Sequence, residues 1–304
     1  MISKVFCAAI LFLLLPACHK KPSPTVLVDP ALAMLVSPDT VLLAGIRMEP
    51  LRSTPLYQRL ITGRTPARLE GFIRDTGLDP RKDIWEFLIA HNGKDAVVMA
   101  RGKFAEMGLE PRLNREGAVR MQYKGYTLLG DAKNAVAFMN SSTAVAGPSS
   151  AVRSIIDMRN AAQGGIPAVF AEKIKSISSA NQLWVAGNIH GRLPMLDFRG
   201  SGNLANLNNI LPAIKTFDTA IDLRTGCKAH ANAVFDSEQD AKRVKETLRG
   251  LIGFARLNTP ENRLERLRVF DGIKVEYSQN VLTVDADLPV DLLDEMMKLE
   301  NYLR

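Results

Sequence analysis

Short turns between apolar segments limit how this chain of 304 residues can fold. Two pairs of strand-like segments are joined in this way: residues 84–90 and 96–100 around Asn92-Gly93, and residues 218–223 and 228–235 around Arg224-Thr225-Gly226. Asn-Gly between such segments is a strong hairpin signal, and hairpins join antiparallel strands. Helical patterns alternate with these segments. We therefore predict an α+β fold of mostly antiparallel sheets, with helices packed on one face.

The order of elements in the first half returns in the second. Leu183-Trp184-Val185-Ala186-Gly187 resembles Val41-Leu42-Leu43-Ala44-Gly45, and both segments are predicted strands. Further matches keep the same order: the two hairpins, helices 104–115 and 238–256, segments 123–128 and 270–275, strands 134–138 and 280–284, and helices 148–158 and 290–297. We predict an internal duplication, with a first repeat over residues 37–163 and a second over residues 166–304. The sequence leaves open whether the two halves share one sheet.

The turns and helix starts of the first half carry a family resemblance. Ser37-Pro38-Asp39-Thr40 precedes the first strand, and a Leu-x-x-Thr-Pro-Leu segment begins at Leu51 in a predicted helix over residues 51–61. This pattern resembles duplicated bacterial envelope proteins of unknown function. The resemblance implies a repeated α+β body over most of the chain. Because its motifs are packing and turn residues, it implies no catalytic residue. A helix over 67–75 and strands over 119–129 and 144–146 complete the expected elements.

The first 18 residues have the pattern of an export signal. Lys4 supplies a positive charge, and Val5–Leu15 is an apolar run too short for a bilayer, which needs about 20 residues. Leu15-Pro16-Ala17-Cys18 then resembles a bacterial lipobox. That resemblance implies a signal peptide over residues 1–17, lipidation of Cys18 and a tether over residues 18–36. The alternative is ordinary signal cleavage that leaves Cys18 as an incidental thiol.

The signal also predicts where the protein resides. We expect a lipid-anchored protein of the cell envelope, held in the outer membrane through Cys18 and facing the periplasm, because His19 is not the aspartate associated with inner-membrane retention. The net charge of +7 could suit nucleic acid, but export removes that partner. An envelope protein, a polysaccharide or a lipid is the expected partner. Arg192, Met195, Phe198 and Arg199 form the candidate partner-binding loop, because a long loop with exposed apolar groups can bind.

No residue pattern predicts a catalytic, metal or cofactor site. The four histidines (His19, His91, His190 and His230) lack the spacing of a zinc site, and no phosphate-binding glycine motif is present. Asp285 and Asp287 share one face of a predicted strand, where they could hold Ca²⁺ or act as an acid/base pair. We favour a simpler role, in which Asp287 and Asp291 lie near the start of the last helix and its dipole. Cys227 is predicted to be buried, on the opposite face of its strand from His230.

Three functions remain after these exclusions. We favour a membrane-anchored envelope lipoprotein with a binding or structural role and no catalysis. An envelope hydrolase with a dispersed site is one alternative, and it requires a pocket with two or more strongly shifted pKa values. A carrier of lipid or another apolar molecule is the other. A carrier requires an apolar cavity lined by residues such as Leu43, Trp184, Phe235 and Met296, whereas core packing is the expected role of Trp184.

Overall fold

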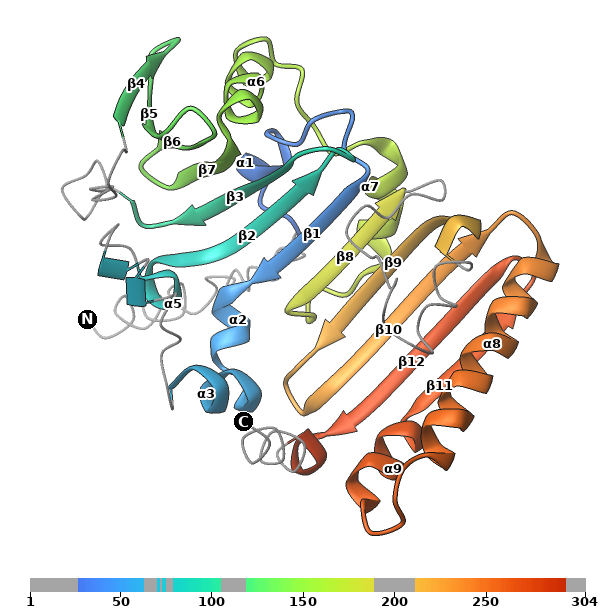
Figure 1. The fold of residues 1–304 in the computed structure, drawn as a ribbon. Coiled ribbons are helices and arrows are strands. Elements are labelled where there is room, and N and C mark those ends of the chain that lie inside the picture. Colours follow the sequence, from blue (N-terminus) through green and yellow to red (C-terminus); the bar gives the residue numbers. More distant parts are fainter. Residues whose placement is uncertain are drawn as a thin grey trace, which may run out of the picture.

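The computed structural model describes residues 27–62, 79–104, 119–188 and 211–293, with positions 70, 71, 73 and 74 between the first two ranges. Twelve strands form one sheet in the order β11-β12-β10-β9-β8-β1-β2-β3-β7-β6-β5-β4, and every pairing is antiparallel (Figure 1). The predicted α+β class with an antiparallel sheet is confirmed. The strands are β1 Leu42–Arg47, β2 Ile84–His91, β3 Ala96–Gly102, β4 Val119–Tyr123, β5 Tyr126–Gly130, β6 Asn134–Asn140, β7 Thr143–Pro148, β8 Leu183–Asn188, β9 Ile214–Asp222, β10 Gly226–Phe235, β11 Ile273–Ser278 and β12 Val281–Pro289.

The two halves of the chain share this sheet, which settles the question that the sequence left open. β1 and β8, the first strands of the two predicted repeats, pair with each other at the centre. Two glycines of these strands let an aromatic ring of the neighbouring strand lie directly against the backbone. Trp184 lies over Gly45, and Phe217 lies over Gly187 on the opposite face. The duplication itself stays a prediction. The sheet order changes one match within the predicted duplication. β12 lies beside β10 in the second half as β7 lies beside β3 in the first. β12, which holds the predicted strand 280–284, therefore corresponds to β7 and not to β6, which holds the predicted strand 134–138.

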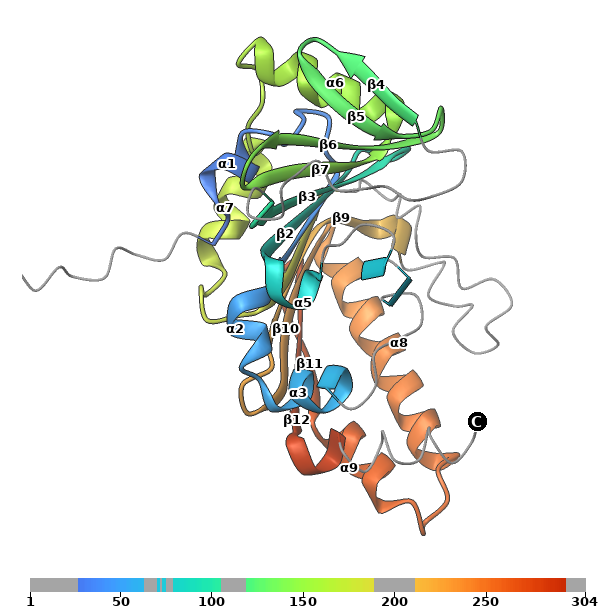
Figure 2. The same cartoon turned by 90° about the vertical axis from the view of Figure 1, so that its left-hand side faces the viewer.

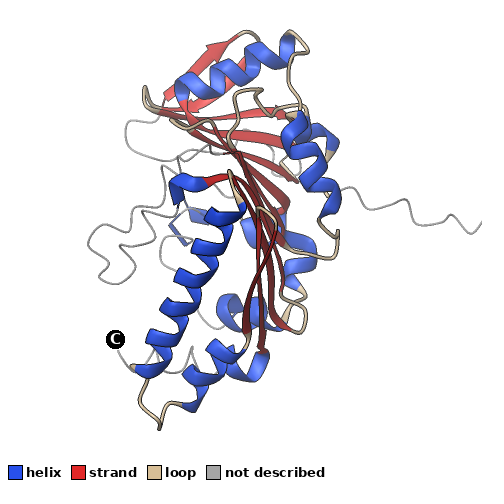
Figure 3. Ribbon diagram, turned by 90° about the vertical axis from the view of Figure 1, so that its right-hand side faces the viewer, coloured by secondary structure: helices blue, strands red, loops and turns tan. Residues whose placement is uncertain are grey.

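Helices lie on both faces of the sheet, whereas the sequence predicted helices on one face only. α1 Pro30–Ala33, α6 Ser149–Asn160 and α7 Ala168–Ser176 cover one face, and α8 Glu238–Leu257 covers the other (Figures 2 and 3). The reason is that α8 packs Ala241 and Val244 on the apolar side of β10, β11 and β12. Further helices in the described ranges are α2 Met48–Arg52, α3 Pro55–Thr62, α5 Pro80–Asp83, the 3₁₀ turn Leu211–Ala213 and α9 Leu264–Asp271.

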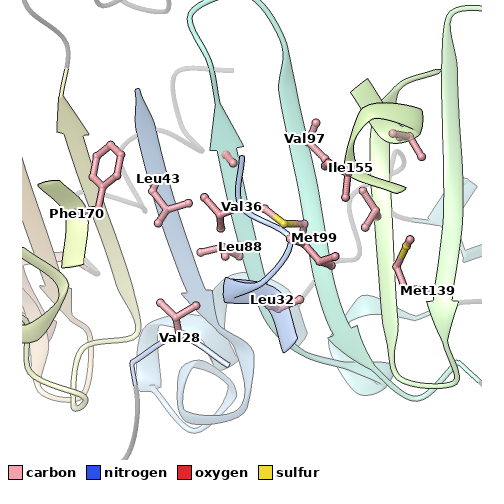
Figure 4. Close-up of a cluster of buried hydrophobic side chains, with 14 of the residues drawn as sticks. Val28, Leu32, Val36, Leu43, Leu88, Val97, Met99, Met139, Ile155 and Phe170 are labelled. Carbon is pink, nitrogen blue, oxygen red and sulfur yellow. The ribbon is translucent and has the colours of Figure 1, made fainter. Parts of the chain in front are cut away.

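Each helix layer closes its own core. In the larger one, Leu32 and Val36 around α1 and Phe170 of α7 converge on Leu43 and Met99 of the sheet (Figure 4). In the smaller core, Phe235, Val275 and Leu282 lie under α8. Ser237 caps α8 by accepting a hydrogen bond from the Asp240 amide, as the sequence predicted for Asp236-Ser237.

Some elements differ from their predicted form for local reasons. The helix expected over 51–61 divides into α2 and α3, because Pro55 starts a new helix. The strand expected over 119–129 is a hairpin that turns at Lys124-Gly125, both with positive φ. Segment 270–275 begins as the end of α9 and becomes β11 only at Ile273. α7 was not predicted. Of the helix expected over 67–75, residues 70, 71, 73 and 74 are described and are helical, whereas the helix expected over 104–115 lies outside the described residues apart from Phe104.

Candidate functional site

A polar trough of about 630 Å³ lies on the sheet face opposite α8. Its floor consists of β9, β10 and β12, and the segment that follows α7 forms one wall. Side chains alternate between the faces of a strand. On β10, Ala233 and Phe235 therefore pack toward α8, while Lys228, His230 and Asn232 point into the trough. The trough is further lined by Ser176, Ile177, Ser178, Asn181, Asp218, Ala220, Asp222, Gly272, Lys274, Asp285 and Asp287.

Strand register places the polar side chains of the trough in rows. Asp218, Asn232 and Thr283 lie directly across from one another on β9, β10 and β12. His230 and Asp285 belong to the next row. Facing residues of this kind have Cβ atoms about 5 Å apart, which is close enough for hydrogen bonds between short side chains.

A continuous hydrogen-bond network runs along these rows. Asn232 Nδ2 donates to Asp218 Oδ2 at 3.1 Å and lies 3.1 Å from His230 Nε2. Thr283 Oγ1 donates to Asn232 Oδ1 at 3.1 Å. His230 Nδ1 lies 2.6 Å from Asp285 Oδ1. At the buried end, Lys173 Nζ of α7 pairs with Asp218 Oδ1 at 2.9 Å.

Each of the four trough carboxylates has a basic partner. The Lys173–Asp218 pair is largely buried, with side chains 16% and 11% exposed. Lys228 Nζ lies 3.3 Å from Asp287 Oδ2, and His230 is the partner of Asp285. The hydrogen bond from the Arg224 side chain lowers the pKa of Asp222 to about 2. Lysine and arginine side chains of the molecule therefore compensate three of the four carboxylates, and Asp285 faces a histidine ring.

The network occupies the histidine that could have served as a base. Because a carboxylate only accepts, the amide nitrogen of Asn232 must face Asp218, and its second N–H then points at Nε2 of His230. The proton of the neutral ring is consequently on Nδ1, where it is donated to Asp285. A general base needs a free acceptor near a substrate proton. With both ring nitrogens engaged, the arrangement is suited to recognition more than to proton transfer.

The structure brings together only some of the residues singled out in the sequence. Asp285 and Asp287 share a face of β12, as predicted, and both line the trough. Asp291 lies in a helical turn that starts at residue 290, and the hydrogen bond from Arg268 at 3.0 Å lowers its pKa. His91 is buried at the end of β2 and faces the opposite side of the sheet from His230. Among the described residues, no three His, Cys, Asp or Glu side chains are grouped closely enough to hold a metal ion.

Cys227 lies at the start of β10 and is half-buried. Burial raises the pKa of its thiol. Three positions separate it from His230, so the two side chains lie on opposite faces of the strand, as predicted.

Three of the four residues suggested for an apolar carrier lie in packed cores. Leu43 and Trp184 are fully buried in the core under α1, α6 and α7, while Phe235 is fully buried in the separate core under α8. These three residues therefore form solid cores on two faces of the sheet, and Trp184 has its expected packing role. Met296, the lipidation candidate Cys18 and the loop residues Arg192, Met195, Phe198 and Arg199 lie outside the described residues. None of the described helices is both long and apolar enough to cross a membrane.

Sequence reasoning missed Lys173, Asp218 and Asn232. The available signal was the alternation of polar residues along the predicted hairpin, at 216 and 218 and again at 228, 230 and 232. That pattern predicts one polar face across both strands. Lys173 could not be found in the same way, because it lies 45 residues before Asp218 on a helix that was not predicted.

Comparison with known proteins gives a likeness of fold. No family model matches the chain, and no curated protein matches it. Among solved structures, crystal form I of TP0453 is similar with a TM-score of 0.50 and 12% identity, covering 89% of this chain and 96% of that one. Crystal form III of TP0453 has a TM-score of 0.50 and 11% identity over 85% of this chain and 93% of the other. At such identities the likeness concerns the fold alone.

Proposed function

We propose that this chain is a membrane-anchored envelope lipoprotein that binds a partner through the polar trough and performs no catalysis. The observation that carries the proposal is the network on β9, β10 and β12. It holds five polar side chains at fixed positions in an open trough of about 630 Å³ while leaving both nitrogens of His230 engaged. Fixed polar groups in an open concavity are suited to recognition.

The anchor is supported by the sequence of the first 18 residues. With Cys18 as the first mature residue, its acyl chains would hold the protein at a membrane without any spanning helix, since each buried methylene contributes about 0.8 kcal/mol. We expect Cys18→Ala, or treatment with globomycin, to change the migration of the protein and to remove the acylated N-terminal peptide seen by mass spectrometry. Unchanged migration of the treated protein, with an unlipidated peptide in the untreated one, would contradict lipidation.

The binding role is tested by comparing two charge reversals of equal size. Asp287→Arg changes the trough, and Glu246→Arg changes an exposed position on α8, on the other side of the sheet. The lipidated full chain and both variants are used to capture partners from envelope fractions, with mass spectrometry of proteins, glycans and lipids. We expect a stoichiometric partner that the wild type and Glu246→Arg retain and Asp287→Arg loses. Equal retention by all three would contradict binding at the trough.

The hydrolase alternative has weaker support in this geometry. It requires two or more strongly shifted pKa values in one pocket. Within the described part of the trough, the pKa lowered to about 2 belongs to Asp222, and its cause is the neighbouring Arg224 side chain. A strongly paired surface carboxylate is a structural arrangement, which gives no reason to assign it a catalytic role.

A further inference from the structure

We propose that the trough contains a proton-driven relay, in which protonation of His230 breaks the hydrogen bond between Asn232 and Asp218. The relay would regulate the binding face and therefore rests on the function proposed above. It is carried by the hydrogen-bond geometry of four side chains on three neighbouring strands.

The neutral state has one consistent hydrogen-bond pattern. The two N–H groups of the Asn232 amide are shared between Asp218 Oδ2 and His230 Nε2, each at 3.1 Å. The amide oxygen accepts from Thr283 Oγ1. Asp218 can only accept when ionised, so the amide cannot be turned around without losing this contact. The pattern is complete only if His230 Nε2 carries no proton.

Protonation makes this pattern impossible. Both nitrogens of an imidazolium are donors, so Nε2–H would point at an amide N–H only 3.1 Å away. Rotating the amide places Oδ1 against His230, where it accepts a charge-assisted hydrogen bond, and turns Nδ2 toward the Thr283 hydroxyl, which can also accept. The same rotation sets Oδ1 against Asp218 Oδ2, two acceptors facing each other. Asp218 therefore loses its Asn232 donor and keeps only Lys173.

Charged groups of both signs face His230 in the trough. Among the described residues on this face, β12 contributes Asp285 and Asp287, β9 contributes Asp218 and Asp222, and Lys228 and Lys274 come from β10 and β11. Two further cations, Lys173 and Arg224, are paired with Asp218 and Asp222. Asp285, at 2.6 Å from Nδ1, is the nearest of these groups, and its carboxylate can accept from Nδ1–H whether or not Nε2 carries a proton. The relay is therefore tested from about pH 5 to pH 8, the range in which histidine side chains in general change charge.

The relay connects the open surface of the trough to its buried base. Asp218 is 8% exposed and binds Lys173 of α7. When Asn232 turns away, one oxygen of Asp218 is free to accept a hydrogen bond from a ligand. We therefore infer that a partner carrying hydroxyl or amine donors binds more tightly at pH 5.5 than at pH 8.

Nuclear magnetic resonance on the ¹⁵N-labelled full chain in detergent tests the relay without any partner. Between pH 5 and pH 8, the His230 ring, the Asn232 side-chain amide and the backbone amides of α7 are followed together. We expect all three to titrate with one midpoint. His230→Gln should abolish the movement of the Asn232 and α7 signals. Asn232→Ala should leave the ring titrating and abolish the response of α7, while His91→Gln, the control on the opposite face, should change nothing.

An Asn232 amide that stays fixed while the His230 ring titrates would overturn the relay. If either His230→Gln or Asn232→Ala does not fold, the other variant alone tests the relay. Failure of the relay is separable from failure of the proposed function. Loss of co-titration with intact partner capture contradicts the relay alone, whereas co-titration without any captured partner contradicts the binding role.

Discussion

Replacing Gly45 by alanine tests the packing that joins the two halves. Gly45 lies opposite Trp184 in the β1–β8 pair, and a Cβ at this position would overlap the indole ring. Trp184 is 2% exposed and packed in the larger core, so its ring has little room to move. Gly187 faces the Phe217 ring in the next pair. The glycines therefore leave space for aromatic side chains of the neighbouring strand.

The expected cost follows from two competing effects. Glycine in a strand or helix interior is about 0.5–1 kcal/mol less favourable than alanine, so the backbone alone would make the substitution stabilising. Overpacking a rigid core costs about 1–3 kcal/mol, and complete loss of a buried tryptophan costs about 3–5 kcal/mol. Because the added Cβ meets the ring directly, we expect Gly45→Ala to lower the free energy of unfolding by about 3 kcal/mol.

Urea unfolding followed by circular dichroism measures this cost, and α8 supplies the control. A Cβ added at Gly253 would meet no other heavy atom within 4 Å. Gly253→Ala should therefore raise the free energy of unfolding by about 0.5–1 kcal/mol. A smaller ring should restore part of the loss, so the double variant Gly45→Ala/Trp184→Phe should lose less than the sum of the single variants. If Gly45→Ala is as stable as the wild type, the close approach of β1 and β8 is refuted.

Three further predictions concern the trough and the lone thiol. Lys173→Met should lower the free energy of unfolding by about 3 kcal/mol, because it leaves the nearly buried carboxylate of Asp218 without its cation. Lys175→Met, which breaks an exposed pair with Glu172, should change the free energy of unfolding by less than about 0.5 kcal/mol. Equal effects of the two variants in urea unfolding would contradict a buried Lys173–Asp218 pair. The pKa of Asp222 is lowered from 3.8 to about 2, so its pairing with Arg224 stabilises the fold above pH 4 and this contribution is lost as the pH falls through 2. Arg224→Ala should flatten stability in that pH window, and an unchanged acid profile would count against the pairing. Cys227 should be alkylated slowly by iodoacetamide in the folded protein at pH 7.5 and quickly in urea, because burial raises the pKa of its thiol; equal rates would contradict burial.

The strands were predictable where local chemistry determines them. Asn92-Gly93 and Gly226 mark two-strand hairpins in the sequence, and Gly93 and Gly226 both have positive φ in the structure. Local signals also predicted α8 and its Ser237 cap. They did not reveal that Pro55 divides one predicted helix into two, or that Lys124-Gly125 turns one predicted strand into a hairpin. At both places the local sequence is compatible with the continuous and with the divided element, and packing decides between the two.

The site was less predictable than the fold, because its contacts join distant segments. The spacing of Asp285 and Asp287 was enough to place both on one face of a strand. Their neighbours depend on the pairing of β10 with both β9 and β12, which puts Asn232 between residues 14 positions before it and 51 after it. No local pattern specifies such a register. It results from the hydrophobic alternation of three strands that must all direct their apolar side chains toward α8.

The fold also determines how the trough would be presented if Cys18 carries the lipid. Leu27 and Val28 are buried in the larger core, and Asp29 caps α1 on the same sheet face that bears the trough. Eight residues separate Cys18 from Leu27, and the nine Cα–Cα steps between them span at most about 32 Å. The tether would therefore join the body on the trough side and hold that face within reach of the membrane surface. A partner of the trough would then be a molecule at or near that surface, and shortening residues 19–26 should weaken its capture without changing the stability of the fold.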